Sequence, residues 1–141
     1  MFKQLLLAID GSDHAKRAAE KAVELASLEG SGTVEILYVV VGNKSKSDVL
    51  QYGDSDSASR KRKQMLTQYE DMMKQAGIEF TTTILHGSNG AAESIIDHAN
   101  KSDYDALVIG SRGLGAVQQM VLGSVSHKVI KHVKAPVLMV K

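Results

Sequence analysis

Residues 5–12 read Leu5-Leu6-Leu7-Ala8-Ile9-Asp10-Gly11-Ser12, an unbroken apolar run followed by a turn. A strand that is apolar at consecutive positions is typical of a parallel sheet covered on both faces. Gly11 favours a turn, and Ser12 or Asp13 can cap the amino end of a helix. The stretch therefore predicts a buried strand that leads directly into a helix.

The same strand-and-helix alternation continues to the end of the chain. Further strands are expected where β-branched and other apolar residues cluster, at Thr33–Val41, Glu79–Leu85, Ala106–Ile109 and Pro136–Val140. Apolar residues at helical spacing predict helices that include Ala15–Ala26, Met65–Ala76, Ala92–Ala99 and Val125–Val133. The pattern predicts one α/β domain over residues 1–141, with a parallel sheet and helices on both faces. The polar, aperiodic residues 43–59 are expected to form a mobile loop within it.

Composition narrows the classes of function. The 141 residues are 43% apolar, carry a net charge of +1 and contain no cysteine, which excludes disulfides, thiolate catalysis and cysteine–zinc sites. The five histidines show no metal-ligand spacing, and the basic run at residues 60–63 is interpreted as a solvated helix face. No apolar run is long enough for a membrane span or a signal sequence. We therefore expect a cytoplasmic protein that binds neither nucleic acid nor membrane.

Two turns are candidates for a binding site, because ligands in open α/β sheets bind beyond the carboxyl ends of the strands. One turn contains Asp10, and the other spans residues 110–116. If their strands are neighbours, the turns face each other across one crevice. Glycines in the second turn allow positive φ angles, close backbone approach and an anion-binding nest of amides. Gly123 and Ser124, the latter a candidate N-cap, then open a helix whose amino terminus suits phosphate.

The spacing of these glycines carries a family resemblance. Gly110, two residues, Gly113, nine residues and Gly123-Ser124 match neither the Walker A pattern nor a full Rossmann fingerprint. The arrangement resembles the ATP-binding motif of the universal stress protein family, G-x2-G-x9-G-[S/T]. Residues 6–12, 36–40 and 135–140 resemble the family as well, so the likeness spans nearly the whole chain.

The resemblance implies a five-stranded parallel sheet of order 3-2-1-4-5, a Rossmann-like fold of the adenine nucleotide alpha hydrolase type. It implies ATP as the ligand, with Mg²⁺ or Mn²⁺ carried on the phosphates rather than on protein side chains. Asp10 would face the nucleotide and the Val39 backbone would receive the adenine. The full set of implied nucleotide-binding residues is Ala8, Asp10, Val39, Gly110, Ser111, Arg112, Gly113, Leu114, Gly115, Ala116, Gly123, Ser124, Val125 and Ser126. His127 stands where many relatives carry an acidic residue.

Several functions remain open from the sequence. The first is an ATP-binding regulator of the stress response with no or slow hydrolysis, because no catalytic residue is evident; autophosphorylation at Ser124 or Ser126 is compatible with it. The alternative is a nucleotide-dependent enzyme, an ATPase or transferase on the same fold. A flavin or dinucleotide carrier is disfavoured because the glycines follow the fourth strand, and a relative that has lost ATP is disfavoured by the intact spacing. A homodimer is expected through the apolar edge strand 136–140.

Overall fold

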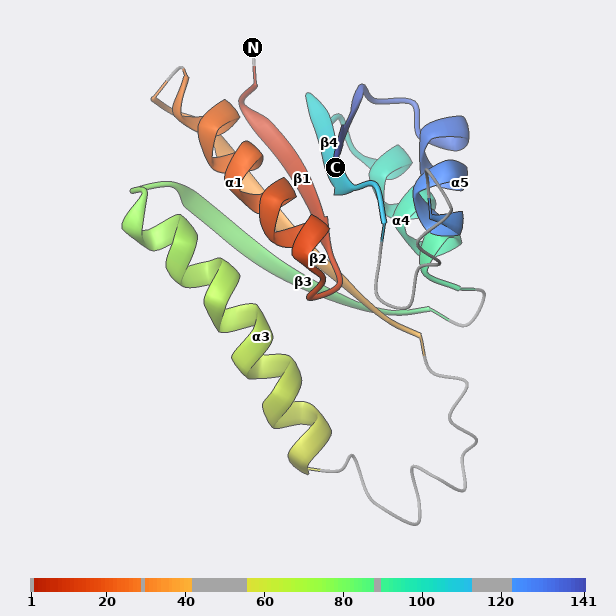
Figure 1. The fold of residues 1–141 in the computed structure, drawn as a ribbon. Coiled ribbons are helices and arrows are strands. Elements are labelled where there is room, and N and C mark those ends of the chain that lie inside the picture. The colour runs from red at the N-terminus through yellow and green to blue at the C-terminus, as the bar shows by residue number, and fades with distance from the viewer. Residues whose placement is uncertain (1, 29, 42–55, 88–89, 113–122) are drawn as a thin grey trace.

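The computed structural model describes residues 2–28, 30–41, 56–87, 90–112 and 123–141. Within these ranges the chain alternates strands and helices as the sequence predicts (Figure 1). The elements are β1 (Gln4–Ile9), α1 (Asp13–Ser27), β2 (Thr33–Val41), α3 (Asp56–Gln75), β3 (Glu79–Gly87), α4 (Ala91–Lys101), β4 (Ala106–Gly110), α5 (Ser124–His132) and β5 (Val137–Val140).

The five strands form one parallel sheet of order β3-β2-β1-β4-β5. The predicted fold class and strand order are therefore confirmed. β1 lies at the centre, where Ala8 pairs with Leu37 of β2 on one side and with Ile109 of β4 on the other. The chain reverses its direction of travel across the sheet between β1 and β4, so this is the switch point at which open α/β sheets bind ligands.

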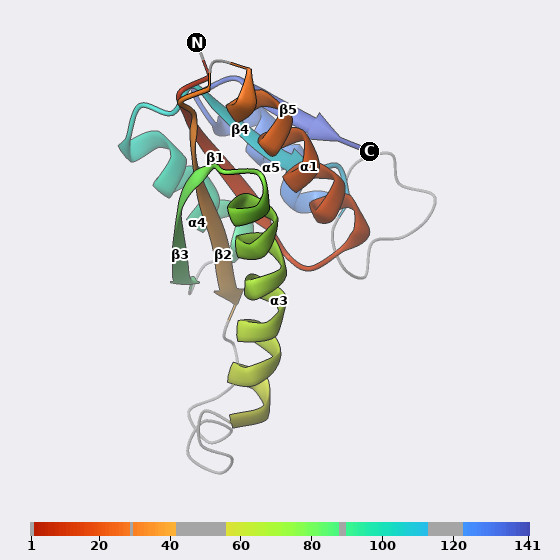
Figure 2. The same ribbon diagram turned by 90° about the vertical axis from the view of Figure 1, so that its left-hand side faces the viewer.

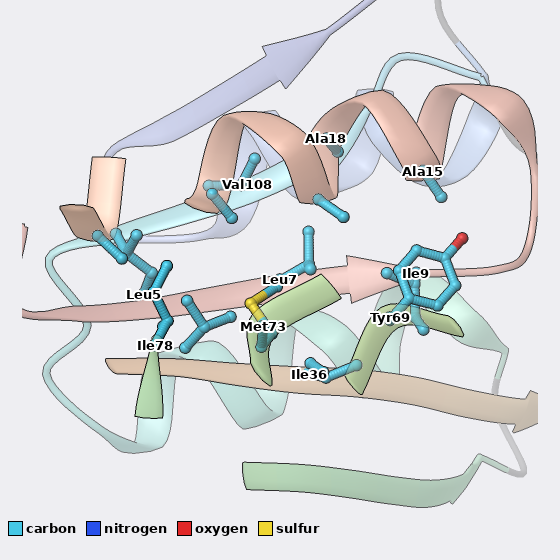
Figure 3. Close-up of a cluster of buried hydrophobic side chains, with 14 of the residues drawn as sticks. Leu5, Leu7, Ile9, Ala15, Ala18, Ile36, Tyr69, Met73, Ile78 and Val108 are labelled. Atoms are coloured by element: carbon cyan, nitrogen blue, oxygen red, sulfur yellow. The ribbon is translucent and has the colours of Figure 1, made fainter. Parts of the chain in front are cut away.

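The continuous apolar run of β1 is explained by two cores, one on each face of the sheet. Leu5, Leu7 and Ile9 pack with α1 and α3 on one face, and Figure 3 shows part of this cluster. Leu6 and Ala8 pack with α4 and α5 on the other face. Because side chains alternate between the faces of a strand, covering both faces requires apolar residues at every position.

Helix α3 differs most from the sequence expectation. It begins at Asp56, so residues 56–59, predicted as loop, are helical, and residues 43–55 lie outside the described part of the chain. The amino-terminal turns of α3 project past the carboxyl ends of β2 and β3 (Figures 1 and 2). An apolar stripe develops only where a helix packs against a core, so these turns lack the periodicity that would have predicted them.

Strand β3 is two residues longer than predicted, ending at Gly87 instead of Leu85. It continues because β2 continues beside it, pairing Val40 with His86 and Val41 with Gly87. Ladder pairing with a long neighbour therefore outweighs the turn-forming tendency of residues 86–87. No helix among the described residues combines the length and apolar character that crossing a bilayer requires.

Candidate nucleotide site

The two candidate turns lie side by side in the structure. They follow β1 and β4, which are adjacent parallel strands, so both turns leave the same edge of the sheet. The hydroxyl of Ser12 approaches the carbonyl of Arg112 at 3.5 Å, which links the turns directly. The expectation that the turns face one another is thereby met.

The first turn is ordered by its own polar groups. Oδ1 of Asp10 accepts a hydrogen bond from the Ser12 amide at 2.9 Å, an arrangement that short polar side chains favour in turns. The Ser12 hydroxyl in turn accepts from the Ala15 amide at 3.1 Å and caps α1. Gly11 between them has a φ of +86°, which disfavours any other residue type. These contacts fix the Asp10 carboxylate at the switch point.

Ser111 joins three elements at the start of the second turn. Its amide donates to the carbonyl of Val140 in β5 at 2.7 Å, and its carbonyl accepts from the amide of Gly123 at 2.8 Å. Its hydroxyl lies 3.1 Å from Nδ1 of His14 in α1. The side chain is buried, with 2% of Ser111 exposed. Ser111 therefore holds the two halves of the predicted phosphate cradle together.

Gly110 has a packing role that sequence reasoning did not assign to it. The described glycines with positive φ are Gly11, Gly30, Gly77 and Gly90, and Gly110 is not among them. A Cβ at Gly110 would lie 2.7 Å from the Cβ of His14 and 2.8 Å from its carbonyl carbon. Glycine is required here because the first turn of α1 packs directly on the backbone of β4.

The amino terminus of α5 forms the second half of the cradle. The N-cap is Gly123, with φ −71° and ψ 161° and no side-chain hydrogen bond, so the predicted capping role of Ser124 is wrong. Ser124 is instead the first helical residue, and it is exposed. The first amides of a helix have no acceptor within the helix, and the first turn of α5 contains no acidic side chain. This end of α5 is therefore electrostatically suited to an anion.

The hydroxyl of Ser126 ties α5 back to the sheet. It donates to the carbonyl of Gly110 at 2.7 Å, and the residue is 3% exposed. Ala8, Val39 and Val125 lie in the same apolar cluster, on the α4/α5 face of the sheet. The predicted residues Gly113, Leu114, Gly115 and Ala116 lie outside the described part of the chain.

Within the ranges that the structure describes, no three His, Cys, Asp or Glu side chains are grouped so that they could hold a metal ion. The groups that converge on the site are instead hydroxyls, backbone amides and the Asp10 carboxylate. Such a set can bind a phosphate and orient a sugar, but it offers a cation few direct ligands.

Two polar clusters were missed by sequence reasoning. One is His14, which contacts Ser111 across 97 positions of sequence. The other lies on the α4 side of β2, where Nε2 of His98 is 2.6 Å from one oxygen of Glu35 and the Tyr104 hydroxyl donates to the other at 2.6 Å. Neither cluster has a local sequence signal, because each forms only when distant elements pack together.

The Glu35 cluster makes the stability of the fold depend on pH. Burial raises the pKa of Glu35, but hydrogen bonds from Tyr104, His98 and Thr83, with the charge of His98, outweigh burial and lower the pKa overall. A carboxyl whose pKa is lower in the folded state stabilises the fold above its unfolded pKa of about 4.3. That contribution is lost as the pH falls through the folded value.

We expect Glu35→Gln to lower the free energy of unfolding by about 1 kcal/mol at pH 7, where a hydrogen bond to an ionised group is weakened. The loss should shrink below about pH 4, where the wild-type carboxyl is protonated as well. Urea denaturation between pH 3 and 7 measures both effects. Glu93→Gln, at an exposed carboxyl that pairs with Lys128, is the control and should stay close to wild type. A Glu35→Gln deficit that persists unchanged at pH 3 would contradict the account.

Comparison with known proteins agrees with this architecture. A model of the universal stress protein family matches residues 1–141. A universal stress protein of Thermus aquaticus is 37% identical over 142 residues, covering 100% of both chains. The solved structure of the protein MJ0577 matches with a TM-score of 0.87 at 25% identity, over 100% of this chain and 96% of that one.

A further solved structure adds a ligand. It is a universal stress protein from Archaeoglobus fulgidus in complex with dAMP, with a TM-score of 0.73 and 24% identity, covering 100% of this chain and 98% of that one. At this identity the likeness establishes a shared fold. The two solved structures thus place the sheet and helices of this chain among known relatives.

Proposed function

The chain belongs to the universal stress protein family, and from this premise we propose that it binds ATP at the adjoining ends of β1, β4 and α5. The observation that carries the proposal is the junction at Ser111. It joins the β4 exit to the amino terminus of α5, beside the Asp10 turn. An anion at this point would meet helix amides and hydroxyls together. The dAMP bound by the Archaeoglobus fulgidus relative supports an adenine nucleotide as the ligand class.

The arrangement of β1, β4 and α5 indicates a position for each part of the nucleotide. The phosphates would lie against the first turn of α5, near Ser124 and Ser126, and would carry Mg²⁺ or Mn²⁺. The adenine would lie against Ala8 and the backbone of Val39, on the apolar α4/α5 face. Asp10 would face the ribose and phosphates from the opposite turn. Residues 110–116 would complete the cradle, as the glycine spacing predicts.

The proposed role is a cytoplasmic nucleotide-dependent regulator of the stress response with little or no turnover. In the sequence of the site, no general base or nucleophile is evident beyond Asp10 and the serines. The alternative is an ATPase or transferase. Hydrolysis well above the background rate, lost in Asp10→Asn, would favour the enzyme over the regulator.

The binding proposal is tested by two measurements on the full chain. Mass spectrometry of small molecules released from the purified protein should detect an adenine nucleotide. Calorimetric titration should then show saturable binding of ATP with Mg²⁺, and much weaker binding of GTP. Failure of ATP, AMP and dAMP alike to bind at millimolar concentration would rule the proposal out.

We also propose that the chain forms a homodimer through β5. This strand lies at the edge of the sheet, and its Leu138 is 38% exposed. An exposed apolar edge is open to pairing, and a twofold contact would cover it.

Light scattering at micromolar concentration should give twice the chain mass. Leu138→Lys should give a monomer, whereas Leu28→Lys, at the 72% exposed residue that follows α1, should remain dimeric. A monomeric wild type would refute the dimer.

A further inference from the structure

The hydroxyl of Tyr69 is buried without a hydrogen-bond partner among the described residues. Tyr69 lies on the core-facing side of α3 and is 1% exposed. A buried hydroxyl that makes no hydrogen bond is uncommon in folded proteins, because it has lost its contacts with water and gained nothing in return. Such a group calls for an explanation.

The position of this hydroxyl suggests one. Figure 3 shows the Tyr69 ring beside Ile9, the last residue of β1, with its oxygen turned toward Ala15 in the first turn of α1. The connection between these two residues is the Asp10 turn. Burial raises the pKa of Tyr69 to about 12, and the negative charge of Asp10 contributes to the rise. The backbone amide of Gly11, which can only donate toward the phenol oxygen, opposes the rise. The unpartnered oxygen therefore lies next to the turn that carries the Asp10 carboxylate.

A second residue of α3 contacts the same turn. Met65 stands one helical turn before Tyr69, and a Cβ added at Gly11 would lie 2.8 Å from its sulfur. Residues four apart share a face of a helix, so Met65 and Tyr69 pack on the turn together. Helix α3 therefore packs against the Asp10 turn through Met65 and Tyr69.

We propose that Tyr69 is a positioning residue of the nucleotide site, whose hydroxyl donates a hydrogen bond to Asp10 when a nucleotide occupies the crevice. The inference rests on the proposed ATP-binding function. A ligand is favoured by any contact that forms only in the bound state, since only a difference between the two states adds to affinity. The proton of the Tyr69 hydroxyl has no acceptor among the described residues, so the hydrogen bond that it would donate is still to be gained.

The test is Tyr69→Phe, which removes one oxygen and keeps the ring in place. Without nucleotide, its melting temperature should equal or exceed that of wild type, because an unpartnered polar atom has been removed. Its affinity for ATP should fall about tenfold or more, the loss of one hydrogen bond to a charged group. A residue with a purely structural role would not raise stability and weaken binding together.

Tyr104→Phe is the matched control. Its hydroxyl donates to Glu35 at 2.6 Å, so its removal should lower the melting temperature and leave ATP affinity unchanged. Wild-type ATP affinity in Tyr69→Phe would overturn the inference while leaving the proposed function intact. A lower melting temperature in Tyr69→Phe would also overturn it, because the hydroxyl would then already be partnered. If wild type itself bound no adenine nucleotide, the proposed function would fail, and the inference with it.

Discussion

Gly110→Ala is expected to lower the free energy of unfolding by about 3 kcal/mol, the upper end of the usual range for overpacking. The added methyl group would lie 2.7 Å from the Cβ of His14 and 2.8 Å from its carbonyl carbon. The carbonyl carbon belongs to the backbone, so no side-chain rotation can relieve the contact. Either α1 or β4 must shift, and both belong to the central packing of the domain. Urea denaturation monitored by circular dichroism measures the loss.

Gly77→Ala is the control for this prediction. Gly77 has a φ of +70°, and a Cβ there would meet nothing within 4 Å. Its cost should therefore be the backbone strain alone, about 1 kcal/mol. If Gly110→Ala proved as mild as Gly77→Ala, the packing explanation for Gly110 would be wrong. The place of Gly110 in the family motif would then have to reflect contact with a ligand alone.

Ser124→Asp is expected to weaken ATP binding by tenfold at the least while leaving the fold as stable as before, or more so. A carboxylate in the first turn of α5 would repel the phosphates, and a charge pair at 4 Å is worth about 4 kcal/mol near a protein surface before screening by salt. The same carboxylate should stabilise the helix by about 0.3–1 kcal/mol, since that turn has no acidic residue. Titration calorimetry and thermal denaturation measure the two opposite effects.

Ser31→Asp controls for the change in net charge. Ser31 is exposed and lies between α1 and β2, at the opposite end of the sheet from the site. The substitution Ser31→Asp adds the same charge to the chain and should leave ATP affinity unchanged. If Ser124→Asp bound ATP as tightly as wild type, the phosphates could not lie against the first turn of α5. Raising the salt concentration should narrow the gap between the two variants, because the repulsion is screened.

The fold was largely predictable because its signals are local. The apolar run from Leu5 to Ile9 predicts a strand buried on both faces, and the turn with the Ser12 cap predicts the helix that follows. The neighbouring position of the two candidate turns was predictable from the alternation of strands and helices and from the family resemblance. Element ends were less predictable where a neighbour decides them, as at β3.

The details of the site were less accessible from sequence. A glycine at position 110 looks the same whether it serves a positive φ, a ligand or a packed helix, and only the position of His14 distinguishes these roles. The partners of Ser111, Glu35 and Tyr69 lie far away in sequence, and no periodicity links them. Spacing therefore predicts where a ligand would bind, whereas the groups that hold the candidate site in shape are visible only in the three-dimensional contacts.

The three contacts of Ser111 have a consequence for the motions of the protein. The Ser111 amide donates a hydrogen bond to the carbonyl of Val140, and the Gly123 amide donates one to the carbonyl of Ser111. Neither amide can exchange with solvent while these two bonds are intact. Hydrogen–deuterium exchange at these two positions should therefore be slow, and exchange at Ser111 should require β5 to separate from β4. Detachment of the edge strand and loosening of the turn would then be one cooperative opening event, visible as a shared exchange rate.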